Sequence, residues 1–173
     1  MNRLRKFAGL SPAARGVFLY SLVLIAVMAL GIRVCAVARC ARFLACLERL
    51  TQRVRGGLSP RETTRLVVAA GSAVRACCLP RSLVLGHMLK AAGASVDVRL
   101  GVSVSAAGDF SAHAWVELDG VPVADEPDLL DRYTPFPPTA IGLGRARQSR
   151  PADRINRLVP RVCRSGDRED RCP

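Results

Sequence analysis

The spacing of hydrophobic and polar positions divides the chain into a helical first half and a strand-forming second half. Residues 12–50 are apolar almost throughout, with arginines recurring among them, which predicts one long helix or a helical hairpin. Residues 60–75 and 78–92 each place apolar side chains on one helical face. Polar and apolar residues then alternate, which predicts three strands at 95–104, 111–117 and 121–125. Helices followed by a small antiparallel sheet make an α+β fold.

Local signals indicate where two of these helices begin. Ser59 and Glu62, with a proline between them, form a capping box. Pro80 is tolerated only in the first turn of a helix, so Cys78 must lie at or just before the start of the next one, which Gly93 ends. The unpaired amides and the dipole at that start favour the thiolate form of Cys78.

Composition separates three parts of the chain. We expect residues 1–55 to form a basic apolar helical segment, residues 56–138 a folded domain, and residues 139–173 an Arg-rich, mostly disordered tail. Adjacent prolines just before the tail exclude regular structure there. The length of 173 residues suits one domain with a hydrophobic core.

The first helical segment is apolar enough to raise the question of a membrane. The 17 uncharged residues from Gly16 to Ile32 reach the lower limit for crossing a bilayer. No small-x-small cleavage site precedes Arg33, and the helical pattern continues beyond it, which argues against a signal peptide. Three interpretations stay open for residues 12–50: a helix packed on the domain, a membrane-surface anchor, and a true span.

The net charge of +12 is concentrated at the two ends of the chain. Residues 1–55 carry ten basic residues against Glu48, whereas residues 56–144 carry seven basic and nine acidic residues. Arginine outnumbers lysine by 24 to 2, which indicates a compositional bias rather than a phosphate-binding patch. We therefore expect no nucleic-acid partner.

The seven cysteines show no metal-binding or disulfide pattern. Their number is odd and no C-x-x-C spacing is repeated, so we predict neither a disulfide framework nor a zinc site, and no cofactor. Three of them lie in the apolar helical segment, where a reduced cysteine behaves as a small buried hydrophobe. A reducing, cytoplasmic location is expected, with membrane association through residues 12–50 as the alternative.

Three residues supply the parts of a nucleophilic site. Cys78 provides a thiol, His113 at the opening of the second strand a base, and Asp125 at the close of the third an orienting carboxylate. Cys77 is the immediate competitor, which we interpret as a neighbour whose side chain points elsewhere. His87 lies in mid-helix and is given no role.

The turn at Asp119 and Gly120 decides which carboxylate faces His113. A two-residue turn would set His113 opposite Glu126 and direct Asp125 to the other face of the sheet. A three-residue loop would set His113 directly opposite Asp125. The sequence allows both loops, and a catalytic role for Asp125 predicts the longer one.

Other residues of interest lie near these three in the sequence. Trp115 shares the strand face of the histidine and either walls a substrate cleft or is an ordinary core residue. Arg81 and Ser82 follow the thiol and either bind substrate or brace the helix. Glu117 and Asp119 are interpreted as solvated hairpin residues.

Residues 60–126 resemble the leader peptidases of lasso-peptide biosynthesis, which belong to the transglutaminase-like superfamily of papain-type cysteine proteases. The matching stretches are CLPRSL from Cys78, LGV from Leu100, AHAWVE from Ala112, and Asp125. This resemblance implies a transglutaminase-like, papain-type core in which Cys78 is the nucleophile, His113 the base and Asp125 its orienter.

The same resemblance implies a reaction and its partners. The substrate would be a ribosomally made precursor peptide that loses its leader, after which a separate ATP-dependent synthetase closes the macrolactam ring. Fused members of the family carry a leader-recognition domain ahead of the peptidase. Residues 1–55 show no strand pattern, so a separate leader-recognition protein is implied. Two other functions stay open: acyl transfer to an amine by the same triad, and a catalytically silent, membrane-attached scaffold that binds a peptide.

Overall fold

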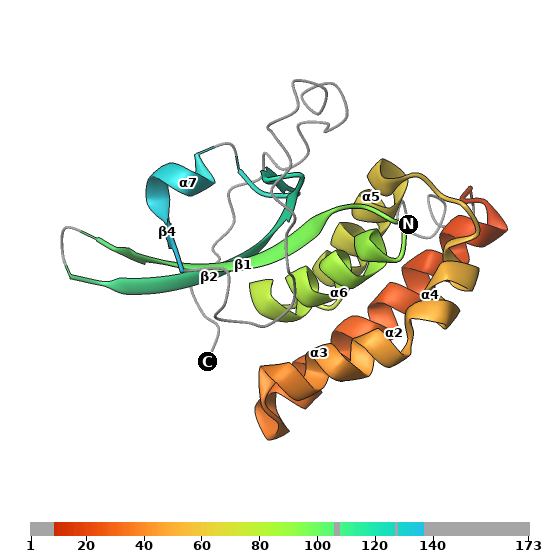
Figure 1. Cartoon of the computed structure of the whole chain (residues 1–173), viewed down its shortest axis with the longest axis horizontal. Helices are drawn as coiled ribbons and strands as arrows, with labels where there is room; N and C mark the ends of the chain where they lie inside the picture. Colours follow the sequence, from red (N-terminus) through yellow and green to blue (C-terminus); the bar gives the residue numbers. More distant parts are fainter. Residues whose placement is uncertain (1–8, 106–107, 127, 137–173) are drawn as a thin grey trace.

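The computed structural model of the chain describes residues 9–105, 108–126 and 128–136. The tail predicted at 139–173 lies outside the described residues. The described elements are stacked in three layers, in which two helices lie between an outer group of helices and an antiparallel sheet (Figure 1).

The outer layer is a helical hairpin. It consists of α2 (Pro12–Val34), α3 (Val37–Cys46) and α4 (Glu48–Arg55). Ser11 caps α2 by accepting a hydrogen bond from the Ala14 N–H at 3.2 Å. Extended backbone at Cys35 and Ala36 ends α2 and lets the chain return as α3 and α4, so the hairpin alternative is the one observed. Apart from a hydroxyl from Ser21, the face of α2 that meets α5 and α6 buries apolar side chains, which include Ala14, Val17, Leu24, Ile25 and Met28.

The middle layer contains the helix that carries the candidate thiol. It consists of α5 (Pro60–Ala73) and α6 (Cys78–Lys90). The predicted capping box of α5 is confirmed, because the Glu62 N–H donates to the Ser59 hydroxyl and the Ser59 N–H donates to the Glu62 carboxylate. α6 begins at Cys78, as Pro80 predicts. The middle of α6 is buried between the outer helices and the sheet, through Leu83, Val84, Leu85, Met88 and Leu89.

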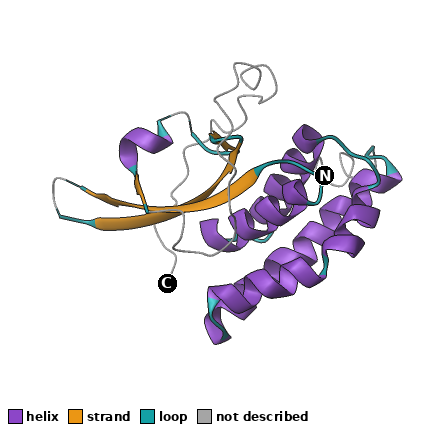
Figure 2. Ribbon diagram, in the orientation of Figure 1, coloured by secondary structure: helices purple, strands orange, loops and turns teal. Residues whose placement is uncertain are grey.

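The sheet has four antiparallel strands in the order β3-β2-β1-β4. They are β1 (Val96–Val104), β2 (Phe110–Leu118), β3 (Val121–Val123) and β4 (Thr134–Pro135). A short helix, α7 (Leu129–Arg132), precedes β4, and neither was predicted (Figure 2). α6 approaches β1 closely at Gly86, where an added Cβ atom would lie 2.6 Å from the Val98 side chain. The helices of the first half and the strands of the second thus form the predicted α+β fold.

Candidate active site

Cys78 is a half-buried free thiol at the first residue of α6. Cys77, at the preceding cap position, is disulfide-bonded. The prediction that the cysteines form no disulfide framework is therefore wrong at that residue. The Leu79 N–H, in the first turn of α6, hydrogen-bonds the Cys78 sulfur. An amide in the first turn of a helix has no partner within the helix, so the Leu79 N–H is available to stabilise negative charge on the sulfur.

The edge of β2 explains how the start of α6 reaches His113. β3 pairs with β2 only from Val116 to Leu118, so β3 does not extend to Ala114, two residues before Val116. There α6 takes the place of the strand. The Ser82 hydroxyl donates to the Ala114 carbonyl at 2.8 Å, and the Ala114 N–H hydrogen-bonds the Cys78 sulfur. The side chain of His113, the residue before Ala114, therefore lies within hydrogen-bonding reach of the thiol.

His113 also contacts Asp125, although the turn between β2 and β3 is not the one we predicted for such a contact. Leu118 pairs with Val121, so the turn contains two residues, and both of them have positive φ. The prediction of a three-residue loop is therefore wrong. The His113 Nε2 atom nevertheless lies 2.9 Å from the Asp125 Oδ1 atom.

The backbone at Ala124 removes this contradiction. β3 ends at Val123, and Ala124 has a left-handed φ of 67°. The alternation of side chains that the register argument extended to residue 126 stops at that point. Asp125 is redirected toward His113, while the Glu126 carboxylate forms a 2.7 Å ion pair with Arg132.

The two ring nitrogens of His113 thus have different partners. Nε2 is hydrogen-bonded to Asp125, which leaves Nδ1 for the Cys78 thiol. All three predicted residues are brought together in the order thiol, imidazole and carboxylate. A family model described as the transglutaminase-like superfamily matches residues 24–137 of the chain.

The chain belongs to the transglutaminase-like superfamily. No curated protein and no solved structure matches it. Superfamily members are generally enzymes with cysteine, histidine and aspartate in the active site, which is compatible with either a cysteine peptidase or an acyltransferase. The match begins inside α2, and our domain boundary at residue 55 stays a prediction.

Arg81 and Trp115 support the histidine and the carboxylate in this transglutaminase-like site. An Arg81 guanidinium nitrogen lies 3.9 Å from the Asp125 Oδ1 atom, while the side-chain stem of Arg81 packs over Gly71. Trp115 is fully buried and its ring stacks beside that of His113, with 6.4 Å between the ring centroids. Because Trp115 has no exposed surface, it cannot contact a substrate in this structure, and it acts on the site only through its neighbours.

Glu117 and Tyr133 were not identified from the sequence as parts of this region. The Glu117 carboxylate is buried and accepts hydrogen bonds from the Trp115 indole and the Arg99 guanidinium, both at 3.0 Å, so our interpretation of Glu117 as solvated is wrong. The Tyr133 ring lies 5.3 Å from the His113 ring. No local sequence signal could have identified Tyr133, because α7 and β4 bring it to the site.

The electrostatics of the site favour a thiolate and an imidazolium. Burial by itself raises the pKa of Cys78, but the hydrogen bond from His113, the amides of Ala114 and Leu79 and the positive charge of His113 outweigh it and lower the pKa overall. Burial likewise tends to lower the pKa of His113, but hydrogen bonds and charges from Asp125 and Cys78 raise it to about 9. The site can therefore hold an ion pair at neutral pH.

We predict that turnover depends on pH through this ion pair. Catalysis should fall as the pH rises through about 9, where the His113 pKa lies, because the imidazolium proton is then lost. It should also fall in acid, because Cys78 becomes protonated as the pH falls through its lowered pKa.

The stability of the fold should depend on the same histidine. Because the folded pKa of His113 exceeds its ordinary value of 6.5, protonation stabilises the fold fully below pH 6.5, and this stabilisation is lost as the pH rises through about 9. Profiles of kcat/KM and of thermal unfolding against pH would measure both effects. An unchanged kcat/KM across pH 9 would contradict the assignment.

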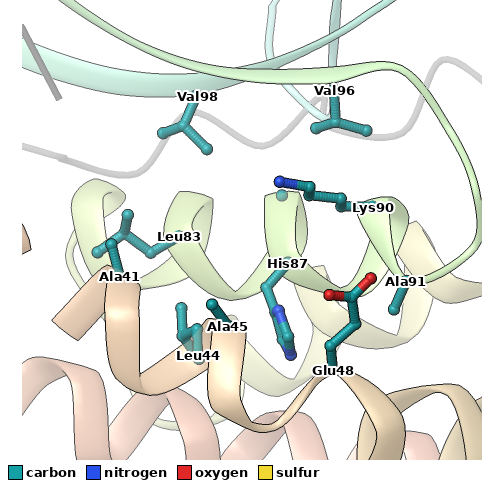
Figure 3. A pocket seen from close by; sticks show the side chains of 11 residues that line it. Ala41, Leu44, Ala45, Glu48, Leu83, His87, Lys90, Ala91, Val96 and Val98 are labelled. Carbon is teal, nitrogen blue, oxygen red and sulfur yellow. The ribbon is translucent and has the colours of Figure 1, made fainter. Parts of the chain in front are cut away.

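A small hollow lies apart from these residues, between α3, α6 and β1. Val96 and Val98 of β1 lie on one side of it and Ala41 and Ala45 of α3 on the other (Figure 3). Neither the thiol, the imidazole nor the carboxylate of the candidate site lines it. The hollow therefore gives no evidence about the substrate of the candidate site.

His87, which lines this hollow, is a structural residue. Its Nε2 atom lies 2.7 Å from the hydroxyl of the buried Thr51, which also hydrogen-bonds Tyr20 at 2.9 Å. Burial is the main cause that lowers the pKa of His87, although the charge of Glu48 opposes it. A neutral His87 ties α6 to α4 through this contact with Thr51. Among the described residues, no group of three or more His, Cys, Asp or Glu side chains could hold a metal ion.

Proposed function

We propose that this protein is a cysteine peptidase that removes the leader from a lasso-peptide precursor. The observation that carries the proposal is the 2.9 Å contact between His113 and Asp125, with the Cys78 thiol on the other ring nitrogen. This order matches the cysteine, histidine and aspartate of the leader peptidases that the sequence resembles.

The chemistry follows from the polarity of the three side chains. The Cys78 thiolate attacks the carbonyl carbon of the scissile peptide bond, and negative charge moves to the carbonyl oxygen. The Leu79 N–H in the first turn of α6 and the Ala114 N–H lie beside the sulfur, where they can stabilise that oxyanion. As the carbon–nitrogen bond breaks, the His113 imidazolium gives its proton to the leaving amine, and a thioester to Cys78 remains. His113 then takes a proton from water, which attacks the thioester and releases the carboxylate and the thiol.

Asp125 would position the imidazole without touching the substrate, and Arg81 would support Asp125. The Asp125 carboxylate fixes the ring orientation and raises the pKa of His113, and the Arg81 guanidinium lies near the same carboxylate oxygen. A direct contact between Arg81 and the substrate stays a prediction.

The same thioester is compatible with acyl transfer, the alternative function. An amine in place of water would attack the carbonyl carbon and give an amide product. Mass spectrometry of the product with and without an added amine distinguishes hydrolysis from transfer. A silent scaffold is disfavoured, because a protein that only holds a peptide does not need an ion pair that activates a thiol.

Efficient cleavage should require a second protein. Residues 1–55 lack a strand pattern, so we propose that a separate leader-recognition protein presents the precursor and that an ATP-dependent macrolactam synthetase uses the product. The purified chain alone should cleave a precursor slowly, and addition of the leader-recognition protein should raise kcat/KM by about tenfold or more by raising the local substrate concentration.

This reconstitution tests the proposed function directly. The released leader and core peptides would be identified by mass spectrometry, with a precursor whose leader is scrambled as the matched control. Efficient cleavage by the chain alone would remove the need for a recognition partner. Absence of cleavage with the partner present would contradict the peptidase function.

A further inference from the structure

The side of α2 that faces away from the core carries a continuous stripe of exposed apolar side chains. Its members are Leu19, Val23, Val27, Leu30 and Val34, which are 52, 57, 41, 65 and 73% exposed. Their spacing of four, four, three and four residues places them within an arc of about 80° and along about 22 Å of the helix. We call these five residues the α2 stripe. It is more apolar than a solvated helix face should be.

The opposite face of α2 limits what can cover the stripe. By length and composition the helix could cross a membrane, with 28% of its most apolar window buried. Its inner face, however, packs on α5 and α6 as part of the core. If α2 spanned a bilayer, α5 would enter the hydrocarbon together with its exposed Arg61, Glu62 and Arg65. A position parallel to the membrane surface has no such cost.

The charges around the α2 stripe select an anionic surface. Arg33 lies at the C-terminal end of the stripe, and Arg39 and Arg42 follow in α3; all three are exposed. The first acidic residue in the chain is Glu48. An apolar face with Arg33 at its end, two more exposed arginines in the next helix and no acid along it is complementary to the acyl chains and phosphates of anionic lipids.

A second copy of the chain fits the same surface less well. If two stripes packed in parallel, Arg33 would lie beside Arg33 of the other copy. If they packed in antiparallel fashion, Arg33 would approach the first turn of α2, which carries Arg15 and no acidic residue. Both arrangements place like charges together.

We propose that the α2 stripe docks this protein on the surface of an anionic phospholipid bilayer. The apolar side chains enter the boundary between headgroups and acyl chains, and the arginines contact the lipid phosphates. The outer helices lie on one side of α5 and α6 and the sheet lies on the other (Figure 1). The strand that carries His113 is therefore on the side of the molecule away from the bilayer. Docking is independent of the reaction that the candidate site catalyses.

The test is co-sedimentation of the full chain with vesicles. The vesicles contain either phosphatidylcholine alone or phosphatidylcholine with ~30% phosphatidylglycerol. The stripe variant is Leu19→Gln/Val23→Gln/Leu30→Gln. The matched control is Val104→Gln/Phe110→Gln, at the tip of β1 and β2, where the side chains are similarly exposed at 66 and 69%. Circular dichroism checks that both variants are folded.

We expect the protein to partition into anionic vesicles about tenfold or more strongly than into neutral vesicles. Added salt should weaken the binding to anionic vesicles. The stripe variant should lose about tenfold or more of this binding, and the control variant none. Equal binding to both kinds of vesicle, or equal loss in both variants, would overturn the proposal. Self-association that depends on the stripe, without vesicle binding, would assign this face to a second copy instead.

Discussion

Replacing Cys78 with alanine or serine should abolish turnover, with a fall in kcat of about 10³-fold or more. Alanine removes the nucleophile. Serine keeps its size, but its hydroxyl has no accessible anionic form in a site whose amides and imidazolium stabilise a thiolate. Single-turnover assays on the purified variants would measure the loss, and circular dichroism would confirm that each variant is folded.

Cys35→Ala is the matched control for this prediction. Cys35 is also a half-buried free thiol, but it lies at the end of α2, far along the chain from the histidine and the carboxylate. Cys35→Ala should retain nearly all of the activity. A comparable loss in Cys35→Ala and Cys78→Ala would mean that the assay responds to general destabilisation, and residual activity in Cys78→Ala would exclude it as the nucleophile.

Selective alkylation gives a readout that does not need the natural substrate. At neutral pH, iodoacetamide should modify Cys78 faster than the exposed thiol of Cys46, even though Cys78 is less accessible, because its lowered pKa leaves more thiolate. His113→Ala should remove most of this advantage. Equal rates at the two thiols in the unmodified protein would contradict the ion pair.

The elements that the sequence predicted well are those with local causes. The capping box at Ser59 and the proline at position 80 act within one turn, and both helices begin where these signals place them. Alternation over ten residues likewise predicted β1 to within a residue. The apolar run of residues 12–50 left a long helix and a hairpin open, because periodicity alone does not reveal a break such as the one at Cys35.

The elements that the sequence did not predict depend on contacts between distant residues. β4 has only two residues and is held to β1 by its pairs with Gly101 and Val102 and by the bond from the Phe136 N–H to the Leu100 carbonyl. Glu117 has the polarity of a solvated hairpin residue, and only the indole and guanidinium donors around it make its burial favourable. These partners could not be identified from spacing along the chain.

The candidate site brings together the residues that the sequence predicted, along a backbone path that was not predicted. Residue types and order selected the three side chains that meet, whereas the backbone path between two of them was predicted incorrectly. A non-glycine residue with positive φ is uncommon, so nothing in the sequence indicated the reversal at Ala124. The paired residues from Val116 to Leu118 keep the register that a two-residue turn requires, and the alternation of side chains fails only beyond Val123, where pairing ends.

That reversal directs the Asp125 carboxylate, and not that of Glu126, toward His113. We therefore expect Asp125→Asn to lower kcat by about 10²–10⁴-fold with little change in KM. Asparagine keeps the shape but loses the charge that orients His113 and raises its pKa. The basic limb of the pH profile should therefore move below pH 9, a shift that a merely structural defect would not produce. Steady-state kinetics across the pH range would measure both effects.

Glu126→Gln is the matched control, because it makes the same chemical change one residue further along. The Glu126 side chain is about half exposed and pairs with the similarly exposed Arg132, so its loss should change neither the rate nor the pH profile. The two-residue turn alone would have assigned the orienting role to Glu126, and a slow Glu126→Gln variant with a normal Asp125→Asn variant would restore that assignment. Normal rates in both variants would leave Cys78 and His113 as a dyad, in which the carboxylate holds the ring in place without contributing to turnover.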